Sequence, residues 1–280
     1  MTALLSLLDD PDRTVYHQVV NRLVEMGEPA IYALEKRWEL SVLDNQQEQI
    51  EKVIRQIQFS QLKKDIINWR LSGGKDLHYG AWLIARVQYP DLRYNTLKVF
   101  LEKIERNIWL ELNDGLTALE KIRVINYFIY TIHGFERSSK KTTAPQLFCI
   151  NHLLESRRGN PVLLGLFYAG IAQKLELPVF GVNLPGNFLL CYFDEACNDD
   201  PDRILFYINP HNKGAVLGRE ELKLYLNQIN MDPDPFYFSP CSNTNILERL
   251  IYNLKHAYKQ TLQEEKINML QELAKSLKNR

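Results

Sequence analysis

The alternation of apolar and polar positions predicts a chain that is helical through its first half. From residue 1 to about residue 40, apolar residues recur every three or four positions, in segments that end at Asp-Pro and Gly-Glu-Pro breaks. One segment places four apolar residues on a single helix face: Val15, Val19, Leu23 and Met26. The same periodicity predicts further helices over 42–70, 78–87, 92–109, 117–133 and 144–154. Thr117 and Glu120 have the spacing of a capping box at the start of one of them.

The pattern changes between residues 155 and 212, the most informative run of the chain. A helix is predicted to begin at Asn160, a favourable N-cap, followed by Pro161, whose missing N–H is not needed at the first helical position. This helix, over 160–175, is apolar almost all round, which is typical of a core helix. Short β-branched and aromatic runs then predict at least three strands, over 179–182, 188–193 and 204–208.

The last part of the chain returns to helical spacing. A turn over 214–218 leads into a short helix over 219–229, and the proline- and aromatic-rich run that follows is predicted to be extended. Two helices end the sequence, over 246–260 and 264–277. The fold class is therefore predicted to be α+β and mostly helical, with a small antiparallel sheet packed on the helix over 160–175.

Composition narrows the class of function without identifying it. The 280 residues are 45% hydrophobic and 24% charged, an ordinary globular balance, and the formal net charge is zero. No global basic field indicates nucleic acid as a partner. No run approaches the roughly 18 uncharged apolar residues of a membrane span, and the first residues lack the cationic start of a signal peptide. We therefore expect a cytoplasmic protein with no membrane partner.

Cysteine and histidine positions give no metal or disulfide pattern. The four cysteines are Cys149, Cys191, Cys197 and Cys241, and they form no CxxC pair. The six histidines show no zinc spacing, so we expect no metal and no cofactor. Three of the cysteines lie in or beside apolar runs and are expected to be buried thiols, whereas Cys197 lies in a polar loop and is expected to be exposed.

Four stretches of the sequence carry a resemblance to a known family. They read LLDDPDRTVY near the N-terminus, WLELNDGLTALEKIRVINYFIYTIHGF over 109–135, GNPVLLGLFYAGIAQKLELPVFGVNLPGNFLL over 159–190 and FYINPHNKG over 206–214. In order and content they resemble the transglutaminase-like fold, and specifically the SirB group of bacterial transglutaminase-like proteins. This resemblance covers nearly the whole chain and implies a transglutaminase-like core with helical N- and C-terminal extensions.

A three-part domain division follows from this resemblance. Residues 1–110 are expected to form a helical N-terminal region whose start resembles a HEAT-type helical pair. Residues 111–235 are expected to form the transglutaminase-like core. Residues 236–280 are expected to form a C-terminal helical hairpin that resembles one tetratricopeptide unit. Because one repeat is too little for a solenoid, both helical regions are equally well interpreted as caps on the core.

The resemblance also implies where catalytic residues would stand. Active members carry a Cys at the N-terminus of the buried helix, a His on a later strand and an Asp at the end of the next strand. The matching positions here hold Pro161 or its neighbour Asn160, then Asn187, then Asn209. None of these side chains is a nucleophile or a base at neutral pH. We therefore expect a pseudoenzyme, a protein- or peptide-binding or regulatory module whose pocket is formed at these positions.

Two alternatives to a binding module remain open from the sequence. The first is a cysteine-dependent amide hydrolase or transamidase with a displaced nucleophile, for which Cys149 and His152, three residues apart on a predicted helix, are the first pair to test. The second is a structural scaffold in which the cleft has closed. An open cleft lined by Asn160, Asn187 and Asn209 favours the binding module, whereas an exposed Cys149 or Cys191 within about 4 Å of a histidine nitrogen favours the enzyme.

Overall fold

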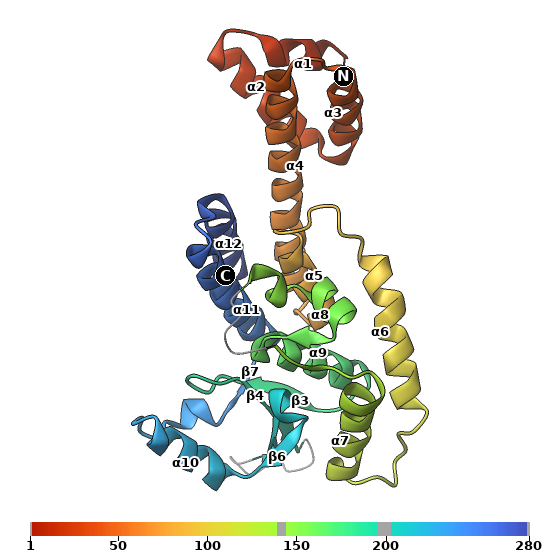
Figure 1. Ribbon diagram of the computed structural model, residues 1–280, viewed down its shortest axis with the longest axis vertical. Helices are drawn as coiled ribbons and strands as arrows, with labels where there is room; N and C mark the ends of the chain where they lie inside the picture. The colour runs from red at the N-terminus through yellow and green to blue at the C-terminus, as the bar shows by residue number, and fades with distance from the viewer. Residues whose placement is uncertain (1, 139–143, 195–202, 279–280) are drawn as a thin grey trace. The chain divides into compact units, whose positions relative to one another are not determined.

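Figure 1 shows the computed structural model, which describes residues 2–138, 144–194 and 203–278. The chain folds as two compact units, Met1–Asn68 and Trp69–Arg280. The three-part division at residues 110 and 235 stays a prediction. No helix in the described ranges combines the length and the apolarity that crossing a bilayer requires.

The first unit consists of helices, as its periodicity predicts. These helices are α1 (Thr2–Ser6), α2 (Arg13–Met26), α3 (Glu28–Leu40) and the greater part of α4 (Asp44–Leu71), with a 3-10 turn at Leu7–Asp9. Their apolar faces share one core that includes Val19, Leu23, Leu34, Ile50 and Ile57. Asp12 caps α2 by accepting from the Thr14 N–H at 2.8 Å, and Gly27 ends it with a φ of 67°.

The second unit contains the remaining helices. They are α5 (Leu77–Ala85), α6 (Tyr94–Trp109), α7 (Ala118–Asn126), α8 (Ile150–Ser156), α9 (Pro161–Lys174), α10 (Arg219–Gln228), α11 (Asn243–Gln260) and α12 (Glu264–Lys278). The capping box at α7 is confirmed, because Thr117 Oγ1 accepts from the Glu120 N–H and the Glu120 carboxylate accepts from the Thr117 N–H. Ser242 caps α11, because its side chain accepts from the N–H of Asn245.

Two predicted helices differ from the observed ones. The helix predicted over 117–133 is α-helical only to Asn126 and continues as a π-helix at Tyr127–Ile132. The helix predicted over 144–154 is divided into a 3-10 turn at Pro145–Phe148 and α8, with Cys149 extended between them. Pro145 is tolerated in the first turn of a helix, but the extended backbone at Cys149 ends that turn before α8 begins.

The sheet of the second unit has five strands in the order β6-β5-β4-β3-β7, and every neighbouring pair is antiparallel. The three predicted strands are confirmed as β3 (Val179–Val182), β4 (Leu189–Phe193) and β5 (Ile204–Asn209). Two edge strands were not predicted: β6 (Ala215–Leu217), which lies in the predicted turn, and β7 (Pro240–Cys241). A separate parallel ladder pairs β1 (Glu136–Arg137) with β2 (Arg158–Gly159).

Helix α9 lies at the centre of this unit, and every residue from Val162 to Ala172 is buried. It contacts β3 and β4 on one face of the sheet, while Leu222 and Leu226 of α10 pack on the strand residues of the opposite face (Figure 1). Around the helix, α5, α8 and α11 complete the enclosure. The predicted α+β class, mostly helical with a small antiparallel sheet on a buried helix, is therefore confirmed.

Close packing against α9 depends on two glycines. A Cβ atom at Gly165 would lie 2.6 Å from the ring of Phe188, and one at Gly170 would lie 2.4 Å from Nε2 of His78. His78 is only 1% exposed, and its Nε2 lies 3.0 Å from the backbone oxygen of Phe167. Burial lowers the pKa of this imidazole, so it packs against α9 as a neutral side chain.

Candidate functional site

The start of α9 is a closed cap. Asn160 Oδ1 accepts from the N–H groups of Val162 and Leu163, at 2.9 and 3.0 Å. The Nδ2 of Asn160 donates to the backbone oxygen of Leu147 at 3.0 Å, and the side chain is only 8% exposed. Pro161 stands in the first turn and brings no N–H. The cap predicted from the sequence is confirmed, and it engages two N–H groups that an oxyanion would otherwise use.

The backbone just before this cap is held by the short parallel ladder. The N–H of Ser138 donates to the oxygen of Gly159, and the N–H of Glu136 donates to the oxygen of Arg157, both at 2.8 Å. Arg158 and Glu136 also form an ion pair at 2.7 Å across the ladder. Arg157 adopts a left-handed conformation with a φ of 63°, which turns the chain from α8 into β2. The start of α9 is thus fixed by backbone bonds from two other segments.

A cavity of about 410 Å³ opens beside this helix start. The residues that line it come from the 3-10 turn before α8, from the start of α9, from the loop before β4 and from α11: Phe148, Asn160, Pro161, Val162, Gly186, Asn187, Phe188, Arg249, Asn253, His256, Ala257 and Gln260. Asn160, Pro161 and Asn187 therefore line the same cavity, and their role as a binding pocket stays a prediction. Asn209 is not among the described residues that line it.

Asn187 lies on the loop between β3 and β4 and is tied to α11. Its Oδ1 accepts from the N–H of Phe188 at 2.9 Å, and the same amide carries the donor group Nδ2. Its backbone oxygen accepts from Nη2 of Arg249 at 3.3 Å, and the oxygen of Leu184 accepts from the same nitrogen at 3.5 Å. Arg249 thereby fixes the loop that carries Asn187 against the cavity wall.

Asn209 is the last residue of β5 and lies apart from the described residues that line the cavity. Its Oδ1 is buried and has no hydrogen-bond partner in the described part of the chain. Pro210 follows at once in a 3-10 turn, and its backbone oxygen accepts from the hydroxyl of Tyr130 at 2.6 Å. Asn126 donates to the oxygen of Gly214 at 2.9 Å and so fixes the far side of this turn. Of the three predicted amides, Asn209 is the one that the structure leaves outside the cavity.

The cysteines do not meet the geometric condition for a displaced nucleophile. Cys149 and Cys191 are both 0% exposed, and burial raises the pKa of each thiol to about 12. Cys149 Sγ lies 3.7 Å from the backbone oxygen of Pro145. Because Cys149 lies outside α8, it does not share a helix face with His152 as the sequence suggested. Cys197, which was expected to be exposed, lies outside the described residues.

Sequence reasoning missed the contribution of α11. Four lining residues, Arg249, Asn253, His256 and Gln260, follow one another at steps of four, three and four positions. This spacing puts them on one face of a helix, and it could have been read as a polar stripe beside the apolar one. Nothing in the sequence indicated that this stripe faces the start of α9, because that contact depends on how α11 packs.

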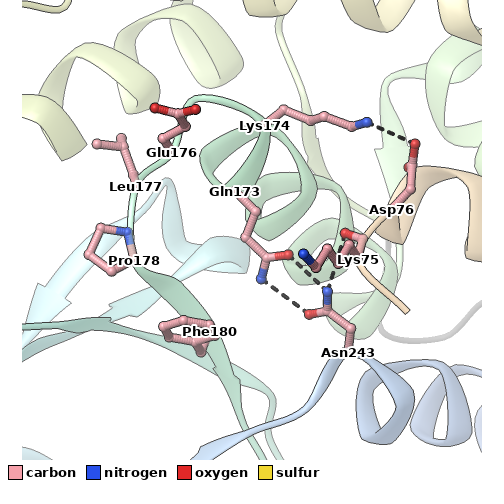
Figure 2. Close-up of a pocket in the computed structure, with 9 residues that line it drawn as sticks. All are labelled: Lys75, Asp76, Gln173, Lys174, Glu176, Leu177, Pro178, Phe180 and Asn243. Atoms are coloured by element: carbon pink, nitrogen blue, oxygen red, sulfur yellow. Dashed lines mark hydrogen bonds and ion pairs between the residues drawn. The ribbon is translucent and has the colours of Figure 1, made fainter. Parts of the chain in front are cut away.

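A second cavity, of about 540 Å³, lies at the other end of α9. Figure 2 shows that Lys174 is directed at Asp76 and Gln173 at Asn243, whereas Glu176 stands apart from them. Lys174 forms an ion pair with Asp76 at 2.9 Å, and the amides of Gln173 and Asn243 exchange hydrogen bonds of 3.1 and 2.9 Å. Asn243 also donates to the backbone oxygen of Gly74 at 3.0 Å. These groups join α5, α9 and α11, and we interpret this network as structural.

Comparison with known protein families covers this region of the chain. A family model described as the transglutaminase-like superfamily matches residues 95–252, more than half of the chain. The matched range includes α9, strands β3 to β7 and the part of α11 that carries Arg249. It therefore spans most of the elements that form the cavity at the start of α9.

Similar proteins come from bacteria, and their names give a family, UPF0162, and no activity. A UPF0162 protein of Xylella fastidiosa (strain Temecula1) is 27% identical over 187 residues, which are 65% of this chain and 64% of that protein. The UPF0162 protein of Pasteurella multocida is 34% identical over 80 residues, 29% of this chain and 30% of its own. The UPF0162 protein YchA of Escherichia coli (strain K12) is 25% identical over 160 residues, 55% and 57% of the two chains. The chain thus spans less than two thirds of the length of these relatives, and no solved structure gives a significant match.

Proposed function

Because the chain belongs to the transglutaminase-like superfamily, we propose that it is a non-catalytic member that binds a protein or peptide through the cavity at the start of α9. The observation that carries this proposal is that Pro161 and Asn187 line one open cavity. The positions where the family would place its nucleophile and its base thus line the same cavity, yet neither side chain can act as a nucleophile or a base. An open cavity that lacks a nucleophile and a base is suited to binding a ligand without reacting with it.

Amide cleavage or transfer requires groups that the cavity lacks. A nucleophile needs a side chain that can become an anion and a base that accepts its proton. Pro161 has no such group, and the amide of Asn187 does not accept a proton at neutral pH. The three described cysteines, Cys149, Cys191 and Cys241, all have raised pKa values because they are buried. These facts weigh against the alternative of a displaced cysteine nucleophile.

The finer family assignment is also part of this proposal. We assign the chain to the SirB group within the superfamily, on the motifs over 109–135, 159–190 and 206–214. The favoured biological role is regulatory, through recognition of a protein or peptide segment. A cavity of about 410 Å³ has the size of one or two side chains, so it suits a short segment of a partner.

The proposal is tested by measuring binding and turnover on the same protein. The probe is a pool of synthetic N-acetylated tripeptides, with binding read by saturation-transfer NMR. Substituting Asn253→Trp fills the cavity from α11 and should abolish the signal, whereas Lys255→Trp, on another face of the same helix, should leave it unchanged.

Turnover is measured as ammonia release from glutamine-containing peptides, with and without an added amine. We expect no release above the uncatalysed rate. Turnover that disappears in a Cys149→Ala or Cys191→Ala variant would overturn the non-catalytic assignment. If no tripeptide gives a binding signal that Asn253→Trp abolishes, the assignment as a peptide-binding module is overturned.

A further inference from the structure

One face of α11 forms a polar wall of the cavity at the start of α9. Four residues of α11 line the cavity: Arg249, Asn253, His256 and Gln260. Each carries at least one N–H donor, because the imidazole of His256 has an N–H in either tautomer. The rest of α11 is a core helix whose buried residues are Ile246, Leu247, Leu250, Ile251, Leu254, Ala257 and Tyr258. The helix therefore directs donors into a space whose other walls include Phe188 and Val162.

The charge of this cavity is not balanced. Among the described residues that line it there is no Asp or Glu, while Arg249 carries a full positive charge. The two acceptors of Arg249 are the backbone oxygens of Leu184 and Asn187, which are neutral and both engage Nη2. A guanidinium has five N–H donors, so this arrangement leaves donors on Arg249 for a ligand.

The second cavity provides an internal comparison. It is lined by two lysines and two acids, Lys75, Lys174, Asp76 and Glu176, and one lysine and one acid are joined in an ion pair at 2.9 Å (Figure 2). Its charges therefore sum to zero without a ligand. The cavity at the start of α9 differs because its cation has no carboxylate among the lining residues.

Other groups of the cavity also favour an anion. Asn187 offers a donor, since its oxygen already accepts from the N–H of Phe188. The positive end of the α9 dipole lies at the cavity, although the N–H groups of Val162 and Leu163 are taken by the cap. The helix therefore contributes its field, and the hydrogen bonds would come from Arg249, Asn187 and α11.

We infer that this cavity binds the carboxylate of a peptide, with Arg249 as the residue that pairs with it. The guanidinium donors that remain, on Nη1 and Nε, can make charge-assisted hydrogen bonds to a carboxylate, and Asn187 and Asn253 stand beside Arg249 as further donors. The apolar part of the lining, from Phe148, Val162 and Phe188, accommodates the aliphatic part of the same residue. This inference deepens the proposed function and rests on it, because it names the chemical group by which a bound peptide is recognised.

A carboxylate can come from the C-terminus of a peptide or from an Asp or Glu side chain, and the probe separates the two. The tripeptide pool is prepared as free acids and as C-terminal amides, each with and without Asp and Glu. Free acids without Asp and Glu should bind if the terminal carboxylate is recognised. Amides that contain Asp or Glu should bind if the side chain is recognised. Amides without Asp and Glu should bind about tenfold more weakly or worse in both cases.

Two variants of the full chain test the role of Arg249. Arg249→Gln removes the charge and should weaken binding of the acids about 10- to 100-fold. Lys75→Gln removes a cation from the second cavity and should leave binding unchanged. Because Arg249 also holds the loop of Asn187, a second variant, Asn253→Asp, keeps the arginine and adds a competing carboxylate. It should cause a similar loss, and Asn253→Gln, which keeps the amide donor without adding a charge, should cause a smaller one.

The outcomes distinguish the two proposals. Equal binding of acids and of amides without Asp and Glu, unaffected by Arg249→Gln and Asn253→Asp, would overturn the carboxylate inference and leave peptide binding in place. No binding by any peptide in either pool would overturn both.

Discussion

Arg249 and Asn187 are joined by a hydrogen bond of 3.3 Å from the arginine Nη2 to the backbone oxygen of the asparagine. The two residues come from α11 and from the loop before β4, which are separated by 62 positions in the chain. This bond ties the helix that forms one wall of the cavity to the loop that carries Asn187. Arg249 therefore belongs both to the framework of the cavity and to its charge.

The cap of α9 makes a first prediction about stability. Asn160→Ala removes the acceptor for two N–H groups and takes from the backbone oxygen of Leu147 the donor Nδ2, so that oxygen keeps only the longer bond of 3.4 Å from the N–H of residue 160. We expect the free energy of unfolding to fall by about 1–3 kcal/mol in a urea titration. Asn160→Ser restores a capping oxygen and should lose less. Equal losses in the two variants would show that the cap contributes nothing of its own.

The contact between His78 and Gly170 predicts a coupling between two positions. Gly170→Ala would bring a Cβ to 2.4 Å from the His78 Nε2, so the variant should be less stable by about 1–3 kcal/mol. His78→Ala removes the obstacle, although it opens a cavity and loses the bond to Phe167. The double variant should therefore cost less than the sum of the single ones in thermal unfolding. Strict additivity would contradict the packing described here.

The buried thiols make a prediction about alkaline pH. Burial raises the pKa of Cys149 and of Cys191 to about 12, above the ordinary thiol value of 9.0. The folded state therefore keeps these protons after the unfolded state has begun to lose them, so their contribution to stability is complete below pH 9 and declines as pH rises toward 12. A Cys149→Ala/Cys191→Ala variant should lose less stability than the original over this range. Parallel stability curves would contradict the prediction.

Labelling with iodoacetamide tests the same burial from the chemical side. At pH 8 the native protein should be labelled slowly at Cys149 and Cys191, and quickly once it is unfolded in urea, as read by peptide mapping. Rapid labelling of native Cys149 would place a reactive thiolate where the structure has a buried neutral group, and would favour the displaced nucleophile.

Restoring a thiol at the start of α9 tests the electrostatics of the cavity. In a Pro161→Cys variant, the helix N-terminus and the charge of Arg249 should lower the pKa of the new thiol below about 8.5. A Gln260→Cys variant puts a thiol in the same cavity at the last residue of α11, where the helix dipole has the opposite sign. The pH dependence of labelling should show a lower midpoint for Pro161→Cys. Equal midpoints would mean that neither the α9 dipole nor the charge of Arg249 lowers the pKa of a thiol at position 161.

Local sequence signals predicted the parts of the fold that depend on neighbouring residues. Asn160 and Thr117 were recognised as caps because each bonds to N–H groups within three positions of it. The buried helix α9 was recognised because its apolar residues cover its whole circumference. These features need no knowledge of which segments meet in space.

The features that were missed depend on tertiary pairing. Strands β6 and β7 are three and two residues long, too short to show alternation, and exist because β5 and β3 provide partners. The cavity role of Arg249 requires α11 to lie beside the loop of Asn187. The three asparagines were expected to converge, but Asn209 is not among the described residues that line the cavity. It ends β5, and the next residue, Pro210, accepts a hydrogen bond from the hydroxyl of Tyr130.

The closed cap at the start of α9 limits what a new nucleophile could do at this position. Substituting a cysteine for Pro161 would supply a nucleophile and would return one backbone N–H to the chain. The next two N–H groups would still be held by Asn160, so a tetrahedral intermediate would find few donors for its oxygen. New reactive side chains at Pro161, Asn187 and Asn209 would therefore not by themselves build an oxyanion site here, since the asparagine that caps the helix also occupies two of its N–H groups.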